Sequence, residues 1–335
     1  MVMKKRMFLG IISVALGVIL CVFGESIAAE KYPSKPIEIV IPFAPGTTDN
    51  LIRPFVEKMP EFLGGQPINF TYKPGAGGTL GIKMVSKEKP DGYTLVATSG
   101  SGMIVIPVVR ERQGDPLGYT YRDFAPIVNF VCQPTAYTVM ASSPWKSWKD
   151  VVDAAKKAPG KYTFTSSGTY GAPDTLLQAV CKASGIKLTY IPATGAAPAV
   201  TAVLGGHVDI AGTGIMSVFP HLQAGKMRTL ASCDPKRSRH LPDVPTFIEL
   251  GYPEIWFPTI YGIFAPKNTP KEVVDAIYVA AKKVSEKYKD QIIPYLDKMG
   301  AEIDIKGPEE YTDQLAQVEK IFFKLTDGLI EKVKK

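Results

Sequence analysis

Hydrogen-bond donors gather in two loops of the sequence, each between a strand-like run and a helix-like run. The first loop holds Gly46, Thr47, Thr48 and Asp49. Backbone N–H groups in the first turn of a helix lack partners within the helix and lie at the positive end of its dipole, so they attract an anion. Threonine hydroxyls add donors without a cation. We expect Asp49 to cap the helix, because two carboxylates repel, and the loop to be half of a carboxylate clamp. The alternative is an ordinary strand–helix turn.

The second loop has the same construction and predicts the other half of the clamp. Gly171 permits close approach of a backbone, and Pro173 suits the first turn of a helix. A phosphate-binding loop is the alternative, but the sequence contains no GxxxxGK[ST] motif. The candidate residues of this loop are Ser166, Ser167, Gly168, Thr169, Tyr170, Gly171 and Ala172.

Further candidates follow other predicted strands. They are Ser99, Gly100, Thr194, Gly195, Asp209 and Thr213. Asp209 has two interpretations, because its carboxylate can accept from a ligand amine or cap a turn. In open α/β sheets, ligands bind outside the carboxyl ends of the strands, so we expect these loops to converge.

Strand and helix patterns alternate along most of the chain. Regular alternation predicts α/β domains with parallel sheets covered by helices on both faces. The predicted strands are 37–41, 68–72, 93–98, 124–131, 136–140, 162–165, 188–191, 208–211 and 227–232, and the predicted helices include 51–59, 79–87, 148–157, 175–184, 198–204, 271–287 and 309 to the C-terminus.

Catalytic and cofactor motifs are missing from the sequence. The run PGAGGTLG, which ends at Gly81, has no GxGxxG register and predicts a tight structural turn. His207, His221 and His240 show no metal-ligand spacing, and Ser101 lies in no GxSxG elbow. We therefore expect no catalytic residue, metal or cofactor. The alternative is an extracytoplasmic hydrolase or isomerase on the same architecture, which fold alone does not exclude.

The N-terminus has the features of a secretory signal peptide over residues 1–29. Lys4, Lys5 and Arg6 precede an apolar run from Met7 to Phe23, and small residues end at Ala28 and Ala29, where we expect cleavage. A retained membrane anchor is the alternative. Removing residues 1–28 takes three basic residues and one acidic residue, which lowers the net charge from +7 to +5 (36 Lys+Arg minus 31 Asp+Glu). No basic stripe predicts nucleic-acid binding.

By their order and spacing, the motifs from Tyr32 to Pro270 resemble the substrate-binding proteins of tripartite tricarboxylate transporters, the Bug-type periplasmic receptors. The matching stretches are YPSKPIEIVIPFAPGTTD, PGAGG, PDGYTL, SSGTYGAP, IPATGAAPAVTAVLGGHVDI, GKMRTLA, LPDVPTFIELGYP and APKNTP.

The resemblance implies a two-lobed flytrap fold with Rossmann-like α/β lobes joined by crossover strands. Lobe 1 is expected over 30–131 plus 255–335 and lobe 2 over 132–254. It further implies a monomeric periplasmic receptor that performs no chemistry and delivers a small organic carboxylate to membrane permease subunits.

The sequence departs from the family pattern at three places. Pro45-Gly46-Thr47 replaces two adjacent glycines, Asp174 stands where a histidine is common, and Ala193-Thr194-Gly195 replaces Tyr-Lys-Gly. A basic residue is lost beside the expected pocket and an acidic one is gained, which disfavours a highly charged ligand such as citrate. The sequence leaves the ligand open among dicarboxylates, tricarboxylates, aromatic acids and amino acids.

Overall fold

The computed structural model of the protein describes residues 32–257, 259–327 and 329. The described residues from 35 onward belong to one compact unit, which is described by itself. The expected signal peptide, residues 1–29, lies outside the described residues.

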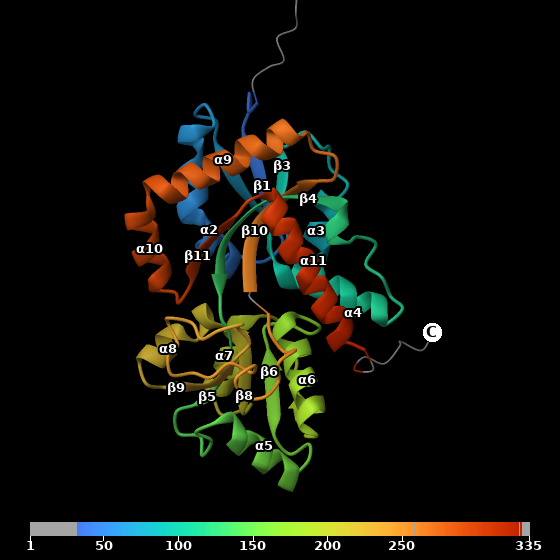
Figure 1. Cartoon of the computed structure of the whole chain (residues 1–335), viewed down its shortest axis with the longest axis vertical. Coiled ribbons are helices and arrows are strands. Elements are labelled where there is room, and N and C mark those ends of the chain that lie inside the picture. The colour runs from blue at the N-terminus through green and yellow to red at the C-terminus, as the bar shows by residue number, and fades with distance from the viewer. Residues whose placement is uncertain (1–31, 258, 328, 330–335) are drawn as a thin grey trace, which may run out of the picture. The chain divides into compact units, whose positions relative to one another are not determined.

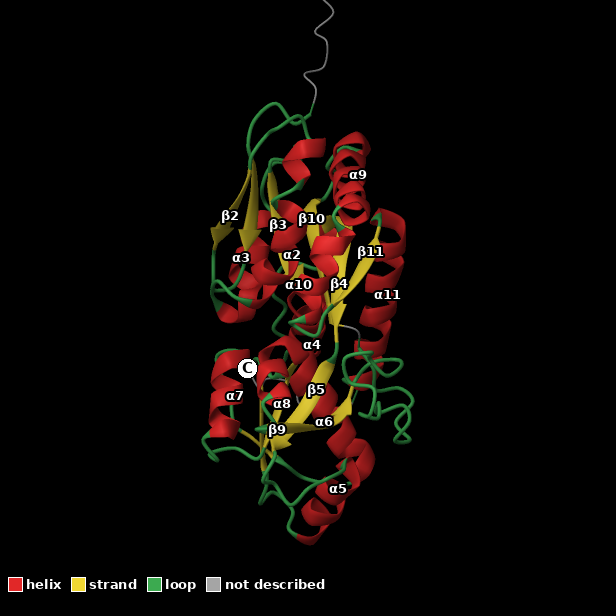
Figure 2. Cartoon of the chain, turned by 90° about the vertical axis from the view of Figure 1, so that its left-hand side faces the viewer, coloured by secondary structure: helices red, strands yellow, loops and turns green. Residues whose placement is uncertain are grey.

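Eleven strands of the described chain form two sheets. The six-stranded sheet, called sheet A, has the order β11-β4-β10-β3-β1-β2, and the five-stranded sheet B has the order β7-β6-β8-β5-β9 (Figure 2). The strands of sheet A are β1 (Ile37–Ile41), β2 (Ile68–Tyr72), β3 (Thr94–Ser99), β4 (Phe124–Gln133), β10 (Thr259–Pro266) and β11 (Glu302–Lys306), and those of sheet B are β5 (Thr135–Met140), β6 (Thr163–Ser166), β7 (Thr189–Tyr190), β8 (Ile210–Gly214) and β9 (Met227–Ser232).

Helices flank both sheets, as the alternating pattern predicts. In Figure 1, α2, α9 and α10 lie on one side of sheet A and α3, α4 and α11 on the other. The helices are α2 (Thr47–Val56), α3 (Thr79–Val85), α4 (Ile106–Arg112), α5 (Trp148–Lys157), α6 (Ala172–Ser184), α7 (Ala196–Leu204), α8 (Phe219–Gln223), α9 (Lys271–Lys287), α10 (Lys289–Asp297) and α11 (Pro308–Leu325).

Local sequence explains the first strand–helix unit. Val40 and Ile41 are buried and β-branched, and Ile37–Ile41 forms the parallel strand β1 between β2 and β3. Helix α2 buries Leu51 and Phe55 at helical spacing, and the Phe55 ring lies 5.0 Å from that of Phe130 in β4. Because both faces of β1 are covered, the strand is apolar except for the half-buried Glu38.

The prediction of parallel sheets is wrong in part, because both sheets are mixed. Strand β10 runs antiparallel to β3 and β4, and β5 runs antiparallel to β8 and β9. The chain enters sheet B through β4 and β5 and returns through β10. A strand that brings the chain back must run against the strand that took it out.

The two chain crossings lie side by side. Only Pro134 separates β4 from β5, and the hydroxyls of Thr135 and Thr259 lie 2.6 Å apart. Phe257 N–H donates to the carbonyl of Cys233, 2.7 Å away, so the return segment joins the end of β9. The strands divide between sheets as the expected lobes require, but the boundaries at 131/132 and 254/255 stay a prediction.

The three cysteines in the described part of the chain carry free thiols. Cys233 is buried, and Cys132 and Cys181 are half-buried. Burial raises the pKa of the Cys132 thiol to about 12, and that of Cys181 to about 12, so both stay protonated at neutral pH. Among the described helices, none is both long and apolar enough to span a bilayer.

Candidate functional site

Strand direction brings the predicted loops to the junction of the two sheets. Strand β4 runs toward sheet B, and β1, β2 and β3 run parallel to it, since β10 is antiparallel to both β3 and β4. Strand β5 runs away from sheet A, and β6, β7 and β8 run against it. The carboxyl ends of these parallel strands therefore all point to one junction, as the ligand rule for open α/β sheets requires.

The first predicted loop follows β1 and opens helix α2. The carboxylate of Asp49 accepts from the N–H of Gly46 at 2.7 Å, so Asp49 caps the helix as predicted. The amides of Thr47 and Thr48 donate to no other group of the described chain. Two first-turn donors are thus free at the end of β1.

Two residues that the sequence analysis missed hold Asp49 in place. The Tyr72 hydroxyl donates to the Asp49 carboxylate at 2.9 Å, and the Arg53 guanidinium lies 3.2 Å from the same oxygen. Tyr72 is the last residue of β2, so the strand-end rule that selected the other candidates would have found it. Asp49 is 3% exposed and lies beside the free amides. The contacts with Tyr72 and Arg53 give this buried carboxylate the partners that it needs.

The second predicted loop follows β6 and opens helix α6. Ser166 donates to the carbonyl of Gly168 at 3.0 Å, and Ser167 N–H donates to the carbonyl of Gly212. The Tyr190 hydroxyl lies 3.2 Å from those of Ser166 and Thr169. Tyr190 ends β7 and was also missed.

The carboxylate of Asp174 is used within its own loop and helix, and its expected place beside the pocket stays a prediction. Its side chain is fully buried and accepts from the N–H of Tyr170 at 2.8 Å and from the amide of Gln178 at 2.6 Å. Burial raises the pKa of the Asp174 carboxyl, and the two hydrogen bonds oppose the shift. The bond holds Tyr170 in the left-handed region (φ 64°), a conformation that non-glycine residues rarely adopt.

One hydrogen bond joins the candidate loops of the two sheets. The N–H of Ala172, the first residue of α6, donates to the Ser101 hydroxyl at 3.2 Å. Ser99 and Gly100 are buried at the end of β3 immediately before Ser101. The structure therefore places the β3 loop against the first turn of α6.

The other candidates fall in three places. Gly195 precedes α7 and is half-exposed, whereas Thr194 beside it is exposed. Thr213 is fully buried in β8, and its hydroxyl has no hydrogen-bond partner in the described chain. Asp209 lies apart from the rest: it accepts from the N–H and hydroxyl of Thr163 at 2.8 and 2.9 Å, at the amino ends of β6 and β8. We remove Asp209 from the candidate site.

The glycine-rich turn that ends at Gly81 packs against the loop that follows β1. A side chain at Gly81 would bring Cβ within 2.8 Å of the Lys73 carbonyl and 2.9 Å of Pro42, and one at Gly78 within 2.7 Å of the Phe43 ring. Glycine is needed at both positions because the neighbouring atoms leave no room for a side chain. This close packing agrees with the prediction of a tight structural turn.

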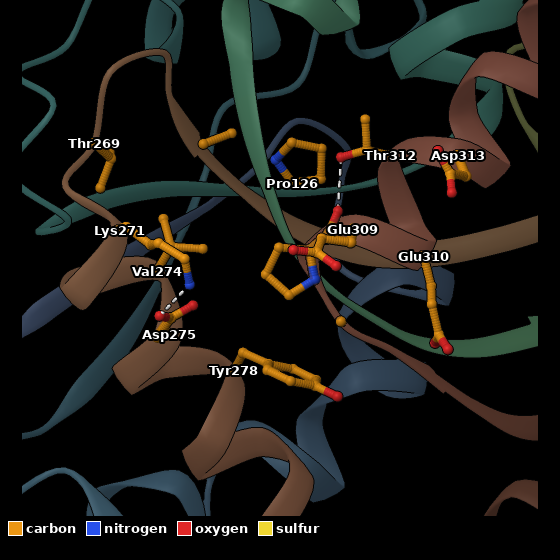
Figure 3. A pocket seen from close by; sticks show the side chains of 13 residues that line it. Pro126, Thr269, Lys271, Val274, Asp275, Tyr278, Glu309, Glu310, Thr312 and Asp313 are labelled. Carbon is orange, nitrogen blue, oxygen red and sulfur yellow. Dashed lines mark hydrogen bonds and ion pairs between the residues drawn. The ribbon is translucent and has the colours of Figure 1, made fainter.

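A surface groove of about 760 Å³ lies elsewhere, at the amino end of β4. In Figure 3, Lys271 pairs with Asp275 on α9, and Glu309, Glu310 and Asp313 project from α11. Because β4 begins there and ends at the junction, this groove is remote from the candidate loops.

Within the described chain, the Ser166 hydroxyl lacks the partners of an activated nucleophile. In the described chain, the Ser166 hydroxyl is bonded to the Gly168 carbonyl and amide and to the Tyr190 hydroxyl, and no imidazole is among its partners. An activated serine needs a base within hydrogen-bond reach. The arrangement favours binding.

The chain has two helix-flanked sheets that are joined by adjacent crossings, and helix N-termini lie at their junction. This arrangement defines the two-lobed fold of periplasmic binding proteins. The model of a family described as tripartite tricarboxylate transporter family receptor matches residues 51–324. The chain belongs to this family of solute-binding receptors, which confirms the resemblance, the fold class and the receptor function.

Relatives agree with this assignment. The chain is 31% identical to the UPF0065 protein in gbd 5'region of Cupriavidus necator, over 99% of this chain and 98% of the relative. A solved periplasmic transporter is 34% identical, with a TM-score of 0.80 over 90% of this chain and 100% of its own. The periplasmic binding protein BugD is 29% identical, with a TM-score of 0.77 over 90% and 100%.

Two more distant structures contain organic acids. MatC of Rhodopseudomonas palustris, with bound malate, and a second R. palustris protein, with adipate, are each 23% identical and have TM-scores of 0.77 and 0.78. They cover 88% and 90% of this chain and 99% and 100% of their own. At this identity the likeness shows the fold alone.

Proposed function

We propose that the protein binds a small organic carboxylate at the junction of its two sheets and delivers it to the permease subunits of a tripartite tricarboxylate-type transporter. The ligand lies between the α2 loop and the loops that open α6 and α7. It leaves chemically unchanged, so the protein is a receptor and no enzyme.

The free first-turn amides of Thr47 and Thr48 carry this proposal. They lie at the positive end of a ten-residue helix and at the carboxyl end of β1, an interior strand of sheet A. The first turn of α7 adds the amides of Ala196 and Ala197, which have no partner in the described chain. Amides of this kind bind a carboxylate without a neutralising side chain.

The chemistry of the loops favours a ligand of low charge. Thr194 stands where the family often has a lysine, so the α7 loop supplies no cation of its own. Asp174, buried in its own hydrogen bonds, neither attracts nor repels the ligand directly. We therefore propose a monocarboxylate or dicarboxylate in preference to citrate.

Calorimetric titration with malate, adipate and citrate tests the function, with the diamide of adipic acid as a neutral control. We expect one or more acids to bind and the diamide not to bind. Ligand at 100 times its dissociation constant adds about 2.7 kcal/mol of stability, which a thermal melt detects. Equal binding of the diamide, or turnover of the acid followed by NMR, would contradict the proposal.

The destination of the protein is part of the proposal. We propose that residues 1–29 direct it to the periplasm and are removed after Ala28 or Ala29. The intact mass of protein from a periplasmic extract measures the cleavage site. A full-length mass in the membrane fraction would instead support a retained anchor.

A further inference from the structure

Ser101 occupies a first-turn donor of α6, the helix whose opening loop the proposed function places beside the ligand. Its hydroxyl accepts from the N–H of Ala172 at 3.2 Å, across 71 positions of sequence and between the two sheets. Ala172 is fully buried. A carboxylate oxygen that binds this amide must take the place of the Ser101 hydroxyl.

The first turn of α6 has few donors, so the loss of one matters. Pro173 has no N–H, and Gly171 N–H donates to the Gly168 carbonyl at 3.3 Å. Thr175 N–H closes the first intrahelical bond to Gly171. Only the amides of Ala172 and Asp174 remain for a ligand, and Ser101 holds one of them.

Local structure fixes Ser101 in this position. A side chain at Gly100 would place Cβ 3.0 Å from Ile260 and 3.2 Å from Phe257, so the backbone before Ser101 lies tightly against the return crossing. Ser101 then begins a π-helical turn, Ser101–Val105, that continues as α4. Such turns are rare in proteins overall, and those that occur are often found at functional sites.

We propose that Ser101 is an internal competitor of the ligand and sets its affinity. This inference rests on the proposed function. The Ser101 hydroxyl satisfies the buried Ala172 amide and links the two sheets. A carboxylate oxygen forms a charge-assisted bond about twice as strong as the neutral one, so the ligand displaces the hydroxyl but loses affinity to the competition.

The variant Ser101→Ala removes the competing acceptor and leaves the Ala172 donor in place. We expect malate or adipate, whichever binds the wild type, to bind the variant about threefold to tenfold more tightly in calorimetry. Ser101→Thr restores the hydroxyl and is expected to restore the wild-type affinity. Ser86→Ala is the matched control, because it removes a local serine bond to the Lys83 carbonyl.

Amide hydrogen exchange gives a readout that needs no ligand. We expect the Ala172 amide to exchange at least about threefold faster in Ser101→Ala than in the wild type, and unchanged in Ser86→Ala. Equal protection of Ala172 in wild type and Ser101→Ala would overturn the inference.

The affinity result separates the two proposals. Weaker or unchanged binding by Ser101→Ala, while the wild type binds, overturns the role of Ser101 and leaves the proposed function standing. Failure of the wild type to bind malate, adipate and citrate contradicts the proposed function, and the competition with it.

Discussion

At the scale of single residues, the proposed binding of a carboxylate depends on backbone N–H donors. The variant Ala172→Pro tests one of them by removing its N–H. Proline suits the first position of a helix, and Gly171 before it has the extended conformation (φ −72°, ψ 170°) that a following proline requires. We expect about tenfold weaker carboxylate binding in calorimetry, because one charge-assisted hydrogen bond is lost.

Ala172→Gly is the matched control for this variant. It keeps the N–H at the same position, so its affinity should stay near that of the wild type. Equal affinity of Ala172→Pro and Ala172→Gly would remove this amide from the binding site.

A second residue-scale prediction concerns Asp234, which lies two residues after the end of β9. Asp234 is buried, and one of its carboxylate oxygens has no partner in the described chain. Burial raises the pKa of this carboxyl to about 7, against an opposing hydrogen bond from Ser232. The folded protein therefore holds this proton more tightly than the unfolded chain, and stability falls as pH rises from about 4 to about 7.

Asp234→Asn should remove this loss of stability. Relative to the wild type, we expect the variant to gain roughly 3–5 kcal/mol in free energy of unfolding between pH 4 and pH 8. Urea titrations across this range measure it, with Asp243→Asn at an exposed site of the same segment as control. Parallel pH profiles for wild type and Asp234→Asn would refute the assignment.

At the scale of elements, the strand–loop–helix unit is stiffened by contacts with its neighbours. Gly81 lies inside α3, where alanine would ordinarily stabilise a helix by up to about 1 kcal/mol. Here Cβ would collide with the Lys73 carbonyl and Pro42. We expect Gly81→Ala to destabilise the protein by about 1–3 kcal/mol in chemical denaturation, because the β1 loop must move. Met84→Ala, at an exposed position of the same helix, should change the stability little. A Gly81→Ala variant more stable than the wild type would show that the Lys73 carbonyl and Pro42 move aside without cost.

Elements governed by local signals could be predicted from the sequence. Helix α5 was predicted with its observed bounds, since Ser147 caps it and apolar residues recur on one face. Strand β10 was missed, because it is apolar on both faces and contains Gly262, which fits only against Val128 and Tyr311. Such positions are decided by tertiary packing.

The candidate site could also be predicted only in part, because some of its features follow from local signals and others from tertiary packing. The loops at Gly46 and Gly171 follow from turn and helix-start chemistry, and strand direction brings them to one junction. The burial of Asp174 depends on how its own loop folds back. Asp209 directly precedes β8, and the strand predicted over 208–211 begins two residues too early. An error of this size is enough to assign a residue to the wrong end of a strand.

At the scale of the whole molecule, the claim is that the sheets hold a ligand between them. We propose that the adjacent crossings at Thr135 and Thr259 act as the hinge between the sheets. The most direct test is a crystal structure with the tightest-binding acid of the panel. The account predicts carboxylate oxygens within hydrogen-bond distance of the Thr47 or Thr48 amide and of the Ala172 amide. An acid bound instead in the groove beside Tyr278, with the strand ends of the junction unoccupied, would contradict it.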